Sequence, residues 1–378
     1  MKFVVNKTSL EVCVKNLCRV INSKNSMPIL SDILCMVDEA QKKITMTSSD
    51  LEIWLHYQVE LKECEGGGSF AIDASLLEAS LKELSEQPLT IFATTESDNI
   101  FRIKHQTGET ILPMDDPSEY PSPKWVGNTA TEWKLDCGVI KRTLKRSLFA
   151  TANDDLRPVI NGIYFDRSDG MMNIVATNGH ILIRNEEDDD NLDGHFIMPK
   201  KVAKILPELM NGSDEVNVLF DERMTSFAYG NMTLVFLDTE GNYPNYRSVI
   251  PKDAPYDFSV DRTSLIKALR NVAHFTPSSS RMVKLNICHD GTLTLFGQDT
   301  DFSTEASDTI DISYEYYSAD MTIGIKADSL IDVLSRIVEK DVTIHFTDPS
   351  RAITITPNEP AYEGETVTAL IMPMLINE

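Results

Sequence analysis

Phe3-Val4-Val5-Asn6-Lys7-Thr8-Ser9-Leu10 returns 255 residues later as Phe258-Ser259-Val260-Asp261-Arg262-Thr263-Ser264-Leu265. A weaker copy, Trp133-Lys134-Leu135-Asp136-Cys137-Gly138-Val139-Ile140, lies 130 residues after the first. Each copy has the pattern of a short strand, a helix-capping type of residue and the start of an amphipathic helix. A period of about 125 residues is a whole domain, far longer than the roughly 20–50 residues of a solenoid repeat. The motif therefore predicts tandem complete domains, which form either a string or a ring.

A second strand followed by a helical pattern also recurs in each copy, beginning at 70–73, 195–198 and 323–326. Alternating strands lie between and after the helices. The six helices are predicted at 7–24, 73–86, 136–152, 198–211, 261–276 and 326–339. The predicted class is α+β, with three copies of a domain that each hold two strand–helix–strands units. Pro-rich stretches near 117–123 and 244–255 suit the joints, and we place the copies at 1–127, 128–251 and 252–378.

Composition indicates an ordinary globular protein of 378 residues, with 42% hydrophobic and 25% charged residues. No apolar run is long enough for a membrane helix, and the start of the chain is too polar for a secretion signal. The six cysteines are scattered and show no metal-ligand spacing. We expect free, mostly buried thiols, a cytoplasmic location and no membrane partner.

The net charge of −23 argues against a nucleic-acid partner, because such a surface repels duplex DNA. The charge is unevenly distributed along the chain, however, since four of the six predicted helices are net positive. For any one helix a solvated face is the simpler interpretation. Four basic helices at equivalent repeat positions favour a shared surface that contacts phosphates without reading sequence. The candidate DNA-facing residues on the helices are Lys141, Arg142, Lys145, Arg146, Lys200, Lys201 and Lys204.

The sequence offers no convincing catalytic site. It has no phosphate-binding Gly-rich loop and no Ser or Cys nucleophile signature. His180, beside the Asn178-Gly179 turn, is more typical of a structural or binding residue. Asp299 and Asp301 have a spacing that suits a metal ion, although a structural turn is the simpler interpretation. We therefore predict no catalytic residue, no cofactor and no metal site. A protein-binding acidic scaffold without DNA binding, and a hydrolase that uses Asp299 and Asp301, remain as alternatives.

Several segments together resemble the family of the bacterial DNA polymerase III β subunit, the replicative sliding clamp. The resemblance spans all three copies in order. Its segments are Pro28-Ile29-Leu30, Ser49-Asp50-Leu51-Glu52, residues 156–162, residues 175–182, residues 243–252 and Met372-Pro373-Met374.

The resemblance implies a head-to-tail homodimeric ring that is lined by helices and closes around duplex DNA without sequence preference. Such a ring tethers the polymerase by topology, and closed rings arise from heterologous interfaces. The implied partners are double-stranded DNA, a second copy of the chain, the DNA polymerase III α subunit, the clamp loader and other proteins with a clamp-binding motif.

The resemblance also implies a groove for short partner peptides. Residue by residue, the groove comprises Arg157, Ile160, Thr177, Gly179, His180, Leu182, Pro244, Val249, Met372, Pro373 and Met374. Methionines there would adapt to varied apolar partners. The chain departs from the family at Ile181, Ser248, Ser280, Lys326 and Ser329, and its tail continues through Leu375-Ile376-Asn377-Glu378. These departures affect the expected peptide preference more than the location of the groove.

The resemblance extends to the DNA contacts and to the ring joint. Lys24 and Arg157 are added to the DNA-facing candidates. Leu112 in the first copy is expected to meet His274 and Phe275 of the third copy across the joint between two chains.

Overall fold

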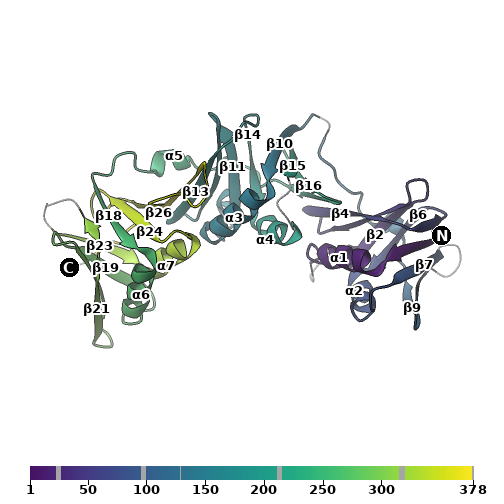
Figure 1. Cartoon of the computed structure of the whole chain (residues 1–378), viewed down its shortest axis with the longest axis horizontal. Coiled ribbons are helices and arrows are strands. Elements are labelled where there is room, and N and C mark those ends of the chain that lie inside the picture. Colours follow the sequence, from purple (N-terminus) through teal and green to yellow (C-terminus); the bar gives the residue numbers. More distant parts are fainter. Residues whose placement is uncertain (23–26, 95–98, 128, 211–214, 315–319, 377–378) are drawn as a thin grey trace. The chain divides into compact units, whose positions relative to one another are not determined.

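The computed structural model describes residues 1–22, 27–94, 99–127, 129–210, 215–314 and 320–376 (Figure 1). This described part of the chain forms two compact units. One contains Met1–Ile140 and Lys204–Asp238, and the other contains Lys141–Ala203 and Thr239–Glu378. The central copy of the repeat is therefore divided between the two units.

The first unit contains two antiparallel sheets, with strand orders β5-β1-β7-β8-β9 and β10-β15-β16-β17-β4-β3-β2-β6. The second of these sheets joins two copies of the repeat, because β17 pairs with β4 and places Leu234 opposite Leu55. The strands are β1 (Lys2–Asn6), β2 (Asp32–Asp38), β3 (Lys43–Ser49), β4 (Ile53–Glu60), β5 (Glu63–Glu65), β6 (Gly68–Asp73), β7 (Pro88–Thr94), β8 (Ile100–His105), β9 (Gly108–Pro113), β10 (Thr131–Asp136), β15 (Glu215–Phe220), β16 (Met224–Tyr229) and β17 (Met232–Leu237).

The second unit has the same design, with strand orders β14-β11-β12-β13-β26-β25-β24-β18-β22 and β21-β20-β19-β23. Here β13 pairs with β26 and places Ile183 opposite Ala369. The strands are β11 (Gly162–Ser168), β12 (Met171–Thr177), β13 (Ile181–Asp188), β14 (Gly194–Pro199), β18 (Tyr256–Asp261), β19 (Met282–Ile287), β20 (Thr292–Asp299), β21 (Thr304–Asp311), β22 (Ser313–Tyr314), β23 (Met321–Lys326), β24 (Asp341–Phe346), β25 (Ile353–Pro357) and β26 (Glu365–Ile371).

The helices begin where the repeat motif places a capping residue. The longer ones are α1 (Lys7–Leu17), α2 (Ala74–Lys82), α3 (Cys137–Ser147), α4 (Lys200–Leu209), α6 (Arg262–Ala273) and α7 (Ala327–Arg336). Asp136 and Asp261 each accept a hydrogen bond from the backbone three residues on, at 2.9 Å and 2.7 Å. These bonds satisfy amides that a helix start leaves without a partner. The bond to Ser264 N is the main cause that lowers the pKa of Asp261. Asn6, the equivalent residue in the first copy, makes no side-chain cap.

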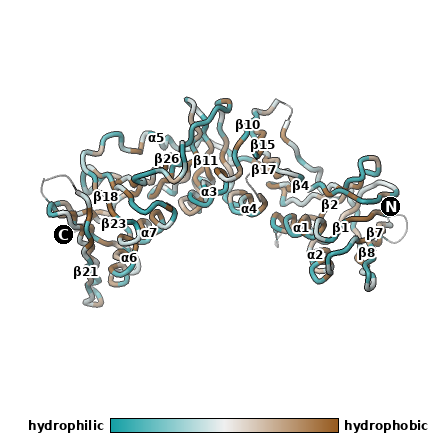
Figure 2. The backbone as a smooth tube through the Cα atoms, in the orientation of Figure 1, coloured by the Kyte–Doolittle hydropathy of each residue, from teal (hydrophilic) through white to brown (hydrophobic). Residues whose placement is uncertain are grey.

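Four helices pack in pairs, α1 against α2 in the first unit and α6 against α7 in the second. The predicted stripe of α1 is buried at Leu10, Cys13, Val14 and Leu17, and that of α6 at Leu265, Leu269 and Val272. Figure 2 shows the same alternation, with hydrophobic segments along the strands and the inner sides of the helices. Each buried leucine or isoleucine contributes roughly 1.5–3 kcal/mol relative to an exposed one.

The helices are shorter than the sequence predicted. α1 ends at Leu17 rather than near residue 24, and α3 gives way at Leu148–Ala150 to a 3-10 turn. A short helix, α5 (Tyr246–Val249), lies where only a Pro-rich linker was expected. The side chain of Asn245 accepts from Ser248 N and so nucleates this turn. Among the described residues, no helix has the length and apolar character that a membrane span requires.

Candidate functional site

A cavity of about 200 Å³ lies in the second unit where β12, β13, β26 and the 3-10 turn Pro158–Asn161 meet the α5 segment. Its lining is mainly apolar, with one arginine and one histidine at the edge. The lining residues are Arg157, Ile160, Thr177, Gly179, His180, Ile181, Leu182, Pro244, Asn245, Tyr246, Val249, Leu370 and Met372. Such a lining suits an apolar peptide segment whose register is fixed by a few polar groups. We call this cavity the partner pocket.

The turn between β12 and β13 is held by its own side chains. Asn178 Oδ1 accepts hydrogen bonds from the backbone N–H of His180 and of Ile181, both at 2.9 Å. Thr177 Oγ1 donates to Ile181 O at 2.7 Å. Gly179 has φ +89°, a conformation that a side chain would strain. These bonds fix the backbone at the edge of the partner pocket, and His180 is exposed there.

The floor of the partner pocket is a packed core cluster of Val175, Leu182, Tyr246 and Leu370. Two further tyrosines pack against it, and their rings stack in parallel with centroids 4.6 Å apart. These are Tyr164 of β11 and Tyr243 from the segment before α5. Residues from distant parts of the chain thus build one rigid floor.

The arginine at the edge is Arg157, which precedes the 3-10 turn Pro158–Asn161. Its guanidinium lies 2.8 Å from Asp154 and remains largely exposed. The hydrogen bond from Arg157 is the largest cause that lowers the pKa of Asp154. Arg157 therefore borders the pocket with its charge accessible to solvent.

The structure brings together the predicted groove residues except Pro373 and Met374. The backbone N–H of Met372 donates to His180 O at 2.9 Å, which holds Met372 at the pocket. Two residues later, Met374 N donates to Gly324 O at 2.8 Å on the edge of β23. Met374 lines a different cavity, together with Leu375 and Ile376. The chain leaves this cavity at Met372, and the roles of Pro373 and Met374 in peptide binding stay predictions.

Sequence reasoning missed Asn245, Tyr246 and Leu370 as lining residues. Tyr246 and Asn245 lie within the quoted segment 243–252, and Leu370 is two residues before Met372 in an alternating strand, so a signal existed. Ile181, named as a departure from the family, also lines the pocket. The other named departures, Ser248, Ser280, Lys326 and Ser329, do not line it.

Two of the predicted DNA-facing arginines do not present their charge to solvent. Arg146 is 4% exposed, and it forms an ion pair with the buried carboxylate of Glu365 and a hydrogen bond of 2.9 Å with Asn185. Arg142 is bound to the same carboxylate and stacks over Tyr362 at 4.1 Å. Helical spacing placed both arginines on a polar face, but both side chains bind Glu365, the first residue of β26. The prediction of DNA contact is wrong for Arg146, and Arg142 is largely covered.

The remaining basic candidates differ in their surroundings. Lys145 and Lys204 are exposed, whereas Lys141 and Lys201 are half-buried. Lys200 Nζ donates to Asn153 Oδ1 at 3.0 Å. Lys24 lies outside the described residues.

The predicted residues of the ring joint also differ in how exposed their side chains are. Leu112 in β9 is 8% exposed, so its side chain already packs within the first unit. Its neighbour Ile111 is 50% exposed, because successive strand residues point to opposite faces. His274 and Phe275, just after α6, are exposed, Phe275 by 38%. Leu112 is therefore mostly covered within its own chain, and Ile111 is the more exposed apolar residue of β9.

The paired aspartates Asp299 and Asp301 form a turn. Asp299 Oδ1 accepts from the backbone N–H of Asp301 at 3.0 Å and of Phe302 at 3.3 Å. Within the part of the chain that the structure describes, no group of three His, Cys, Asp or Glu side chains is placed to hold a metal ion.

Comparison with known proteins agrees with the resemblance seen in the sequence. Three models of the DNA polymerase III beta subunit match in order: the N-terminal domain at residues 1–122, the central domain at 134–245 and the C-terminal domain at 247–375. Curated relatives named beta sliding clamp include that of Haemophilus influenzae, 24% identical with 99% of this chain and all of the relative covered. That of Halalkalibacterium halodurans is 22% identical over 95% of this chain and 96% of the relative.

Solved structures share the fold over the whole chain. The DNA polymerase III subunit beta of Pseudomonas aeruginosa superposes with a TM-score of 0.91 at 22% identity, and that of Thermotoga maritima with 0.87 at 20%. Both comparisons cover 100% of each chain. The α+β class and the three tandem clamp domains are thereby confirmed. On these matches across its length, the chain belongs to the DNA polymerase III beta subunit family, the beta sliding clamps.

Proposed function

We propose that this chain is a replication processivity factor: two copies close as a ring around duplex DNA, and the partner pocket tethers the replicative polymerase. The observation that carries the proposal is the partner pocket itself, an apolar cavity with Arg157, His180 and Met372 at its edge, in a chain that matches the clamp family along its length. The role is mechanical and non-catalytic. We also retain the boundaries 1–127, 128–251 and 252–378 for its three domains, and a cytoplasmic location.

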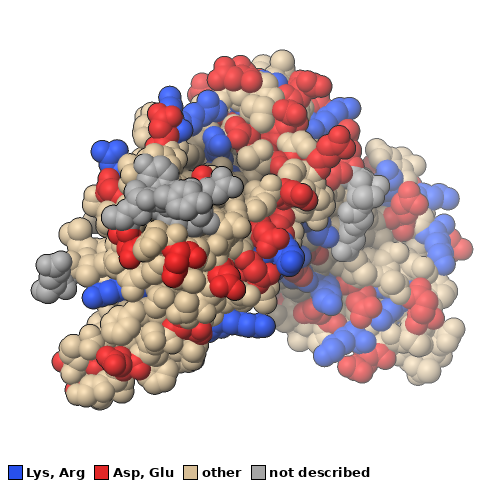
Figure 3. Space-filling view, turned by 60° about the vertical axis from the view of Figure 1, so that its left-hand side comes forward, with Lys and Arg blue, Asp and Glu red and all other residues tan. Residues whose placement is uncertain are grey.

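The DNA contact is assigned to exposed helix cations, and it is independent of base sequence. Lys15 and Arg19 near the end of α1, Lys145 of α3, Lys204 of α4 and Lys267 of α6 are exposed. Phosphate contacts made by such side chains carry no base information and weaken as salt rises. The net charge of −23 leaves acidic side chains over much of the remaining surface, as Figure 3 shows for one face. That excess discourages adhesion to DNA elsewhere on the protein.

The ring joint is assigned to the outer strands of two sheets, one in each unit. β9 ends the order β5-β1-β7-β8-β9, and β21 ends the order β21-β20-β19-β23. An edge strand exposes backbone groups that pair readily with a strand of another chain. Ile111 on β9, with His274 and Phe275 beside the other edge, would supply apolar contact. A joint between different surfaces of two identical chains is heterologous and closes into a ring.

The pocket is assigned to short segments of the polymerase α subunit, the clamp loader and other partners. Griselimycin offers a chemical probe, since the solved structures of the Pseudomonas aeruginosa and Bartonella birtlesii proteins contain it. We expect this chain to bind griselimycin in the partner pocket. The substitution Met372→Ala should weaken that binding by about tenfold, because an apolar thioether contact with the ligand is lost. Leu375→Ala, outside the pocket, is the matched control.

Retention on circular DNA tests the ring directly. Protein loaded onto a nicked circle should remain through gel filtration, and linearising the circle should release it from the free ends. Loss at equal rates from circles and linear fragments would contradict the proposal. An acidic scaffold without DNA binding would be retained on neither.

A further inference from the structure

Tyr246 is the one lining residue of the partner pocket that comes from α5 with its side chain buried, at 4% exposure. α5 is a single turn in the segment that connects the second and third copies of the repeat. So short a helix has little stability of its own. The position of Tyr246 therefore depends on the contacts that hold this turn against the sheet.

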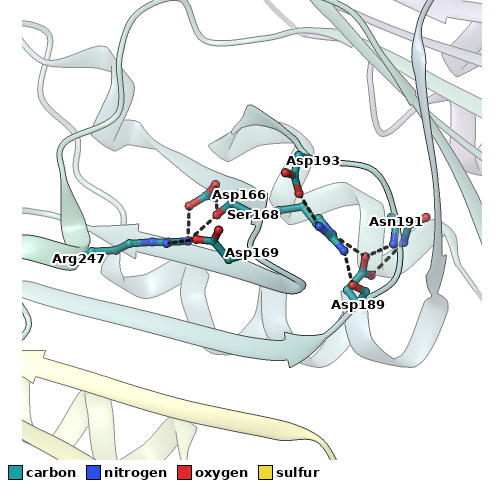
Figure 4. Close-up of polar contacts among 8 residues, drawn as sticks. Asp166, Ser168, Asp169, Asp189, Asn191, Asp193 and Arg247 are labelled. Atoms are coloured by element: carbon teal, nitrogen blue, oxygen red, sulfur yellow. Dashed lines mark hydrogen bonds and ion pairs between the residues drawn. The ribbon is translucent and has the colours of Figure 1, made fainter.

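Those contacts come from a polar network around Arg247, and Figure 4 shows its part with Asp166, Ser168 and Asp169. Tyr246 Oη donates a hydrogen bond of 2.6 Å to Asp166 Oδ2 on β11. The guanidinium of Arg247 donates to Tyr246 Oη at 3.0 Å, to Asp166 at 3.2 Å and to Ser168 Oγ at 2.6 Å. It also lies 3.5 Å from the carboxylate of Asp169. Arg247 thus binds both Tyr246 and Asp166, the carboxylate that accepts the hydrogen bond of the tyrosine.

The network joins two places far apart in the sequence. Arg247 belongs to α5, whereas Asp166, Ser168 and Asp169 belong to the end of β11 and the turn into β12. Arg247 supplies several donors in a fixed planar arrangement, so it restrains direction as well as distance. Hydrogen bonds to charged groups are about twice as strong as neutral ones. Burial and the bond to Asp166 both raise the pKa of Tyr246.

We propose that Arg247 is a positioning residue of the partner pocket, which holds Tyr246 as a pre-formed part of the floor through Asp166 and Ser168. The inference rests on the proposed function, since it specifies how the peptide-binding site is kept ready. When this part of the pocket is ordered before the peptide arrives, binding does not lose free energy to the ordering of a flexible segment. Arg247 itself is 43% exposed and does not line the pocket.

The neighbouring arginine provides a matched control. Arg167 lies on β11 between Asp166 and Ser168, is more buried than Arg247, and binds Asp189 and Asp193 in the connection between β13 and β14. The described hydrogen bonds and ion pairs of its side chain go to Asp189 and Asp193, which do not line the partner pocket. Arg167→Gln should therefore cost at least as much stability as Arg247→Gln without disturbing Tyr246.

Hydrogen exchange on the full-length protein measures the position of the segment without any ligand. In Arg247→Gln, we expect amides of residues 243–250 to exchange about tenfold faster than in the parent protein, because local opening becomes easier. In Arg167→Gln, exchange of that segment should be unchanged. Unchanged exchange in Arg247→Gln, or an equal increase in both variants, would overturn the inference.

Binding of the polymerase α subunit from the same organism supplies the second readout. Arg247→Gln should raise Kd about fivefold, mainly through a faster dissociation rate. Tyr246→Phe should do the same, and the double variant should be no worse than either single one, because both remove the same restraint. Additive losses would contradict the inference. If the parent protein itself fails to bind, the proposed function falls, and the exchange measurement still decides the role of Arg247.

Discussion

Arg142 and Arg146 show how burial decides the role of a single charged residue. Both satisfy the helical spacing of a basic stripe, yet both bind the carboxylate of Glu365 on β26. Asn185 completes the arrangement with bonds to Arg146 and to Ser147. Removing one partner of a buried ion pair leaves an uncompensated charge, which costs much more than the pair contributes.

Substituting Glu365 should therefore be strongly destabilising. Glu365→Gln leaves the guanidinium of Arg146 buried without a counter-charge, and we expect the free energy of unfolding to fall by about 3–5 kcal/mol. Urea unfolding followed by circular dichroism measures the change. Glu109→Gln, which breaks the exposed pair with Arg102, is the control and should cost less than about 1 kcal/mol. Equal losses in the two variants would contradict the buried role of Glu365.

His56 ties the first linker to the sheet of the first unit. Its Nε2 lies 3.2 Å from Lys124 O, its Nδ1 lies 2.9 Å from Thr47 Oγ1, and its ring stacks on Trp125 with centroids 3.9 Å apart. Burial lowers the pKa of His56 to about 4. The folded state therefore binds fewer protons than the unfolded state between pH 4 and about 6.5, so the stability that His56 contributes is present above pH 6.5 and is lost as pH falls.

This difference in proton binding predicts that the contribution of His56 to the free energy of unfolding decreases in acid. The stability advantage of the parent protein over His56→Gln should shrink by about 3 kcal/mol between pH 7 and pH 4. Urea unfolding at several pH values measures the difference, with the exposed residue in His274→Gln as control. A difference that does not vary with pH would show that His56 is not held neutral.

At the scale of elements, the two faces of the edge strand β9 have different roles, one in folding and the other in the proposed association of two chains. Leu112 and Ile111 are neighbours on one strand, but Leu112 points into the core and Ile111 points to solvent. The same period of two that builds the sheet assigns them different roles. The proposed joint uses the side that carries Ile111.

The two substitutions should give opposite results. Ile111→Glu should weaken the dimer by about tenfold or more, because a charge is placed in an apolar joint, with little change in the unfolding of the separated chain. Leu112→Ala should instead lower stability by about 2–5 kcal/mol through a core cavity. Analytical ultracentrifugation and thermal unfolding together distinguish these effects. A stable dimer in Ile111→Glu would exclude β9 from the joint.

At the scale of the whole molecule, charge is distributed by element in a strongly acidic chain. Exposed cations occur on α1, α3, α4 and α6, whereas acidic side chains are abundant over the face that Figure 3 shows. Such a distribution allows contact with phosphates through the helices, while the remaining surface stays unattractive to DNA.

Reversing two helix cations tests this division. Lys145→Glu with Lys204→Glu should weaken binding to a short duplex by about tenfold at low salt, and reduce the slope of log K against log salt by roughly 2. Fluorescence anisotropy across a salt series measures both. Lys134→Glu, which changes an exposed cation on a strand, is the control. An equal loss of affinity in the control would contradict the assignment of DNA contact to the helices.

Much of the partner pocket could be predicted, since Thr177, Gly179, His180, Leu182, Pro244 and Val249 lie in contiguous motifs. Leu370 was missed because its place in the floor depends on the pairing of β26 with β13, and Tyr246 because its place depends on the packing of α5 against β11. The prediction that Arg146 contacts DNA was wrong for a related reason. Periodicity identifies the face of an element, but only the packed structure shows what covers that face.

The sequence by itself determined the triplication, the α+β class, the strand–cap–helix units and the family, because these depend on local periodicity and repeated motifs. The tertiary structure decided that the central copy contributes strands to two sheets, that Met372 ends the partner pocket, and that Arg247 braces Tyr246. It also decided which cations are accessible. These features require contacts between residues far apart in the chain, and such contacts follow from packing, which no local pattern specifies.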